Sequence, residues 1–290
     1  MHPAPSVIIF TVLSGLGFGF LAFLGIGAVH PDGWTAFGLW GLGYALAVGG
    51  LLASTLHLGN PQRALLAFTQ WRSSWLSREA WLSVATLLAL APVALSDWLG
   101  LDWPRVFGLA GAGLALATVG ATSMIYAQLK TVPRWNHWIT PVQFQAFALA
   151  GGAVLAGQGW LAIGLLVLLA CAQVAAFHCG DQQFTRRGQT MATATGLGDI
   201  GDVSVFEQPH TGGNYLMREM IHVVARKHAT KLRRIALALT CLAPAAILLL
   251  PAQPATIALA ILIHLSGAFC ARWLFFAEAE HVVGLYYGQR

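Results

Sequence analysis

Apolar residues form long, unbroken runs along the whole chain, and polar residues collect in the stretches between them. Each run holds about 16 to 23 residues, and a helix needs about 20 residues to cross the hydrocarbon layer of a bilayer. The pattern predicts an all-α fold, with a bundle of eight transmembrane helices in a single transmembrane domain over residues 1–290. The predicted spans are Val7–Val29, Phe37–Leu56, Glu79–Leu95, Val106–Gln128, Pro141–Ala156, Trp160–Cys179, Ile235–Leu250 and Ala255–Ala277.

The composition supports a membrane protein. Hydrophobic residues make up 57% of the chain and charged residues only 9%, whereas soluble domains carry about 25% charged residues. The four cysteines are scattered, with no CxxC pair. We therefore expect no disulfide framework, no iron–sulfur cluster and no metal site in this chain, so metal centres that exchange electrons with it must lie on another chain.

Basic residues predict the orientation in the membrane. Fourteen of the 16 lysines and arginines fall in the connections after the second, fourth and sixth spans or at the C-terminus. Arg105 falls at the opposite end, and Arg272 lies within the last span. Because cytoplasmic loops carry the excess of lysine and arginine, the pattern predicts that both termini and these connections are cytoplasmic.

One connection, at about 180–233, is much longer than the others and is rich in basic residues. It is too long for a linker and too short for an independent domain. We interpret it as a cytoplasmic docking loop for a soluble partner, with Arg218, Arg226, Lys227 and Arg233 as candidate docking residues. The alternative is a solvated loop whose basic end binds lipid headgroups.

Two other patterns are better explained by local structure. Gly196, Gly198 and Gly201 match GxGxxG, but no predicted strand precedes them, so we expect no dinucleotide site. His178 and His264 could be haem ligands on adjacent helices, but they fall at different depths in the predicted bundle. Because bis-histidine ligation needs both at one level, we expect no haem in this chain.

The stretch between the second and third spans carries the most distinctive group of polar residues. About 22 residues separate His57 from Glu79, too few for a crossing with its turns, so both should lie at one membrane face. Arg63, Arg78 and Trp75 lie close to them in sequence. Histidine and a partly desolvated glutamate exchange protons near neutral pH, as quinone chemistry requires. The structural alternative is a histidine that caps a helix and a glutamate that pairs with Arg63 or Arg78.

A second group of ionisable residues follows the last span. It consists of Glu278, Glu280 and His281, in the segment RWLFFAEAEHVVGLYYG. The two interpretations left open are a second polar rim at the cytoplasmic face and a solvated C-terminal helix end.

These segments resemble those of a known family. HLGNPQRALLAF followed by WRSSWLSREA is similar to the membrane anchor subunits of the dimethyl sulfoxide reductase family. NYLMREMIHVVARKHATKLRRIA and WLFFAEAEHVVGLYYG resemble the branch found in cytoplasmic sulfite dehydrogenases, the sulfite:quinone oxidoreductases. The resemblance covers nearly the whole chain.

The resemblance implies a three-subunit complex in the bacterial inner membrane. Its partners would be an iron–sulfur electron-transfer subunit and a molybdopterin catalytic subunit on the cytoplasmic side, with no nucleic acid. The anchor would bind ubiquinone or menaquinone at the family's histidine and glutamate, which match His57 and Glu79. The implied reaction is sulfite oxidation coupled to quinone reduction. The alternatives are a quinol-oxidising anchor of a dimethyl sulfoxide or polysulfide-type reductase and, in another class, a membrane transporter.

Overall fold

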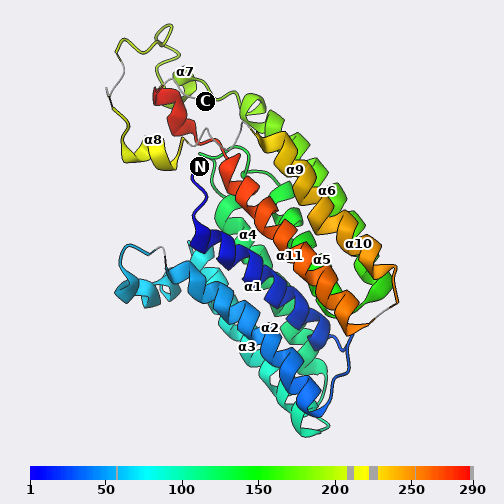
Figure 1. Cartoon of the computed structure of the whole chain (residues 1–290). Helices are drawn as coiled ribbons and strands as arrows, with labels where there is room; N and C mark the ends of the chain where they lie inside the picture. The colour runs from blue at the N-terminus through cyan, green and yellow to red at the C-terminus, as the bar shows by residue number, and fades with distance from the viewer. Residues whose placement is uncertain (57, 208–211, 222–227, 252, 288–290) are drawn as a thin grey trace.

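The computed structural model describes residues 1–56, 58–207, 212–221, 228–251 and 253–287, and every regular element in them is helical (Figure 1). This confirms the all-α fold class. Six of these helices are long and apolar enough to cross a membrane. They are α1 (Pro5–Gly25), α2 (Gly33–Thr55), α3 (Trp75–Leu99), α4 (Val106–Ala127), α6 (Gly159–Arg186) and α11 (Pro254–Ala277).

The two remaining predicted spans also lie on helical segments. α5 (Ile139–Leu155) is apolar but has 17 residues. α9 (Ala229–Leu237), the π-turn η3 (Ala238–Leu242) and α10 (Ala243–Leu248) follow one another without a gap. The number of eight crossings therefore stays a prediction. The shorter elements are η1 (Pro61–Phe68), α7 (Met191–Thr195), α8 (Tyr215–Glu219) and η4 (Val282–Tyr287).

Several helices extend beyond the apolar runs that predicted them. α3 begins at Trp75, four residues before the predicted start, and it ends where Gly100 adopts the left-handed conformation, with φ 67°. α6 continues to Arg186, so the first residues of the predicted docking loop are helical. The thickness of the hydrocarbon layer sets the length of an apolar run. A helix can continue beyond that layer until its last backbone carbonyls accept hydrogen bonds from groups outside the helix.

The central helix of the bundle is α1, which packs against α2, α4, α5 and α11 (Figure 1). Small residues make these approaches possible: Gly17 meets the backbone of Ala47 on α2, and Gly25 meets that of Gly108 on α4. A Cβ atom at Gly152 of α5 would lie 2.5 Å from the carbonyl carbon of Gly19. Lipid offers no hydrophobic drive between helices, so such close backbone contact supplies much of their attraction.

Both ends of the described chain lie at one end of the bundle, with α7, α8 and η4 (Figure 1). The Met1 amino group donates a hydrogen bond to the Ala279 carbonyl at 2.7 Å. The His2 amide donates to the carbonyl of Glu219, the last residue of α8, at 2.6 Å. An even number of crossings is consistent with this arrangement.

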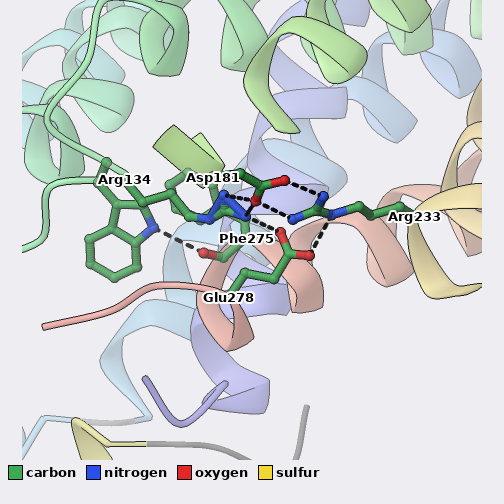
Figure 2. Close-up of polar contacts among 6 residues, drawn as sticks. Arg134, Asp181, Arg233, Phe275 and Glu278 are labelled. Carbon is green, nitrogen blue, oxygen red and sulfur yellow. Dashed lines mark hydrogen bonds and ion pairs between the residues drawn. The ribbon is translucent and has the colours of Figure 1, made fainter. Parts of the chain in front are cut away.

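Four charged side chains form an ion cluster (Figure 2). Arg134, which follows α4, lies 2.7 Å from Asp181 of α6 and 2.9 Å from Glu278 after α11. Arg233 of α9 lies 2.6 Å from Asp181 and 2.7 Å from Glu278. The cluster joins four parts of the chain with two cations and two anions.

Glu278 is the buried carboxylate of the cluster, with 5% of its side chain exposed. Burial lowers the pKa of Arg134, and the carboxylates of Glu278 and Asp181 oppose that shift. A pocket of about 400 Å³ opens beside the cluster, with Gly180 and Thr230 in its wall. Glu278 therefore belongs to this cluster and is not a solvated helix end.

We predict that Glu278→Gln destabilises the protein. Two arginines lose a shared carboxylate, and breaking a buried pair costs on the order of 3 kcal/mol. The thermal midpoint of the purified protein in detergent should fall by several degrees. Glu207→Gln is the matched control, since Glu207 is exposed. Equal midpoints for both variants would show that the cluster does not stabilise the bundle.

Candidate functional site

Glu79 lies inside the bundle, on the face of α3 that packs against α4. The residue is 3% exposed, and its Oε1 atom accepts a hydrogen bond from the Thr122 hydroxyl. Further along the same interface, the hydroxyls of Thr86 and Thr118 lie 3.0 Å apart. The buried residues of α3 recur at helical spacing, so the polar residues Glu79, Ser83 and Thr86 lie on the face of the helix that packs against the bundle.

The other predicted quinone-site residues surround the start of α3. Arg78 donates hydrogen bonds to the carbonyls of Trp71, at 3.0 Å, and Arg72, at 2.7 Å. Its guanidinium also lies 4.3 Å from the ring centroid of Trp75. Arg63 is exposed on η1. Within the described part of the chain neither arginine forms an ion pair with Glu79, so the structural alternative of such a pair is not realised there.

His57 lies outside the described residues. The chain on either side of it is described: α2 ends at Thr55, and η1 begins at Pro61. Both positions are at the end of the bundle where α3 begins (Figure 1). The described residues on either side of His57 therefore lie at the end of the bundle where α3, the helix of Glu79, begins.

Sequence reasoning missed Arg272, a buried cation in α11. The residue is 5% exposed, and its guanidinium carbon lies 3.8 Å from the ring centroid of Phe144 and 5.4 Å from that of Phe275. No carboxylate pairs with it among the residues that the structure describes. The signal was present in the sequence, because an arginine inside an apolar span marks a functional site by default.

A small central cavity lies next to this arginine. Arg272 lines it together with Thr122 of α4 and His264 of α11. The hydroxyl-bearing residues Thr11 and Ser14 of α1 complete its polar wall. Thr122 therefore touches both the cavity and Glu79. The cavity and the predicted site form one connected polar region.

The two histidines considered as haem ligands have different surroundings. His178 is exposed, and its Nε2 atom lies 3.0 Å from the Gln182 amide nitrogen. His264 is 2% exposed, and its Nδ1 atom lies 2.7 Å from the Thr240 carbonyl oxygen. Thr240 belongs to the π-turn, so His264 ties α11 to the segment before it.

The predicted docking residues fall into different environments. Arg218 is exposed on α8, and Arg233 is held in the ion cluster. Arg226 and Lys227 lie outside the described residues. In the GxGxxG match, Gly196 ends α7 with φ 69°, and no strand precedes it in the part of the chain that the structure describes.

Comparison with known proteins identifies the family. The model described as "DMSO reductase anchor subunit (DmsC)" matches residues 1–278. The chain is 29% identical to a sulfite dehydrogenase subunit from Allochromatium vinosum, over 99% of this chain and 99% of that protein. No solved structure matches the chain. Since the family model spans every helix from α1 to α11, the chain belongs to the DMSO reductase anchor subunit family and is an anchor subunit of an oxidoreductase complex.

Proposed function

We propose that this chain is the quinone-binding membrane anchor of a molybdenum and iron–sulfur oxidoreductase. It passes electrons between an iron–sulfur subunit and the membrane quinone pool. The observation that carries the proposal is Glu79, a carboxyl group buried in the first turns of α3 and held by Thr122. α2 ends and η1 begins at this same end of the bundle (Figure 1).

The proposed site supplies protons rather than electrons. Reduction of a quinone to a quinol consumes two electrons and two protons. The electrons come from metal centres on the partner subunit, because the four cysteines of this chain are free and scattered. The protons pass through groups that can gain and lose them beside the two quinone oxygens, and His57 and Glu79 are of the residue types that do so.

The sulfite dehydrogenase relative favours sulfite oxidation as the overall reaction. In that direction the site reduces quinone. The same pair of groups would accept protons in an anchor that oxidises quinol, so the direction depends on the catalytic partner. We propose that this partner is a molybdopterin protein and that it and the iron–sulfur subunit lie in the cytoplasm, against the inner membrane of a bacterium.

The arrangement of charge supports that orientation. The two described ends of the chain and α8, which carries the exposed Arg218, are at the end of the bundle where α3 begins (Figure 1). α6 and α11, which lead to Asp181 and Glu278 of the ion cluster, also end there (Figure 1). This end also carries most of the lysines and arginines, which the positive-inside rule assigns to the cytoplasm.

We expect Glu79→Gln and His57→Gln to remove quinone turnover selectively. Glutamine keeps hydrogen bonding but cannot exchange a proton near pH 7. Turnover with quinone should fall by at least ~10²-fold, the low end of what a positioned proton-transfer group contributes. Activity with an artificial soluble electron carrier should remain, because that carrier bypasses the anchor.

Asp102, which is exposed in the segment before α4 and outside the predicted docking loop, provides the control, and Asp102→Asn should keep both activities. Loss of both activities in Glu79→Gln would indicate failed assembly and a structural glutamate. Full quinone turnover in Glu79→Gln would show that the quinone site lies elsewhere.

A charge-reversal experiment tests docking. Arg218→Glu, Arg226→Glu and Lys227→Glu in one chain should weaken attachment of the soluble subunits, since single exposed charges contribute little but several in a patch add up. Arg233 is left unchanged, because its loss would disturb the ion cluster. Co-purification at low and high salt measures the effect, and an intact complex under both conditions would place docking on another surface.

Orientation is tested with a reporter fused after Arg290. The proposed topology predicts activity for a reporter that works only in the cytoplasm and none for one that needs the periplasm. The opposite result would reverse the topology and remove the cytoplasmic assignment of the partners.

A further inference from the structure

Arg272 is a buried cation with no anion beside it among the residues that the structure describes. Its guanidinium contacts the rings of Phe144, Phe147 and Phe275. Cation–π contacts of this kind contribute roughly 0.5–2 kcal/mol, which is small against the several kcal/mol needed to desolvate an ion. The N–H groups of this side chain have no hydrogen-bond acceptor among the described residues, yet Arg272 borders the central cavity.

The cavity has the size and lining of a water site. Its volume is about 20 Å³, and a water molecule needs at least about 10–15 Å³ of such space and two to four polar partners. The residues with polar groups in its wall are Thr11, Ser14, Thr122, His264 and Arg272. An apolar cavity of this size would stay dry, but this one has a charged group in its wall.

The hydrogen-bond capacity of the wall is complementary. His264 Nδ1 lies 2.7 Å from the Thr240 carbonyl, so this nitrogen carries the proton and Nε2 is left as an acceptor. The Thr122 hydroxyl has one proton, directed to Glu79 or, at 3.0 Å, to the Thr118 carbonyl, and its oxygen can still accept. Arg272 offers only donors. A water molecule can accept from Arg272 and donate to Thr122 and His264.

We propose that ordered water in the central cavity links Arg272 through Thr122 to Glu79, and that Arg272 is a positioning residue for proton transfer by Glu79. This rests on the proposed quinone function and deepens it. When Glu79 gives its proton to a reduced quinone oxygen, the electrons come from the iron–sulfur partner and a negative carboxylate remains. Arg272 stabilises that carboxylate, because charges interact strongly in a poorly solvated interior.

Few other charged or titratable groups lie near Glu79 or the cavity in the described part of the chain. On α3, Arg78 precedes Glu79, but its guanidinium donates to the carbonyls of Trp71 and Arg72. On α4, the titratable Tyr126 is buried, and its ring lies 5.6 Å from that of Phe144, the ring that Arg272 covers. On α11, His264 shares the cavity. α1 and α5 line the cavity with uncharged residues, among them Thr11 and Phe144. Arg272 is the arginine in the cavity wall beside Thr122, which binds Glu79, so its removal should change proton release by Glu79.

The test measures quinone turnover of the assembled complex against pH in Arg272→Gln and Arg272→Lys. Without the positive charge, Glu79 keeps its proton to higher pH, so the limb of the profile that reports its ionisation should move up. The expected shift is about one pH unit, a tenfold change in proton affinity. Arg272→Lys retains the charge and should restore most of the wild-type profile. A profile for Arg272→Gln that superposes on the wild type would overturn the proposal.

A matched pair of threonine variants tests the link if Arg272→Gln does not assemble. Thr122→Val removes the hydroxyl that joins the cavity to Glu79, and Thr118→Val removes a hydroxyl one turn away that contacts Thr86. Thr122→Val should lower quinone turnover at least ~10-fold with the artificial carrier unaffected, and Thr118→Val should not. Equal behaviour of the two variants would contradict the proposed link.

The outcomes separate this inference from the quinone site itself. If Glu79→Gln abolishes quinone turnover but Arg272→Gln leaves the pH profile unchanged, the inference fails and the proposed function stands. If Glu79→Gln keeps full turnover, the proposed function fails first. In the Glu79→Gln background, Arg272→Gln should lower the residual quinone turnover no further, because the group on which it acts is absent.

Discussion

Close backbone contact around α1 is the constraint on which the rest of the bundle depends. Lipid does not drive apolar helices together, so their attraction requires dense packing and small side chains at the crossings. Gly17, Gly19 and Gly25 lie on α1 where α2, α5 and α4 approach it. Because α1 is enclosed in this way, the polar residues that it turns inward, Thr11 and Ser14, can reach only protein groups and the central cavity.

The protein stabilises its charged side chains in two ways. In the ion cluster, Arg134 and Arg233 share the carboxylates of Asp181 and Glu278, and each charge has a direct partner. Arg272 instead faces aromatic rings and the cavity. A cluster in which every charge has a partner holds helices together. A buried ion without a direct counterion interacts strongly with any opposite charge that forms near it.

The sequence predicted the helical class and the six long apolar helices, because side chains that face lipid must be apolar along the whole crossing. It also pointed to Glu79, since a carboxylate at the edge of an apolar run is rare. It could not predict how deeply Glu79 is buried, because that depends on Thr122, a residue of another helix. For the same reason Arg233 was expected to be available for docking, although Asp181 and Glu278 bind it. Residues that are far apart in the sequence and meet only when helices pack leave no recognisable pattern in the local sequence.

The π-turn at Ala238–Leu242 determines which residues of α9 and α10 face the rest of the bundle. Each residue of an α-helix rotates the chain by about 100°, but a π-turn takes up one extra residue without rotating the helix that follows it. The inward-facing positions of α10 are therefore shifted by one residue from the pattern that α9 begins. Removal of one residue within the π-turn would give a regular helix with both halves still facing their neighbours, whereas the same deletion elsewhere in this segment would turn one half away.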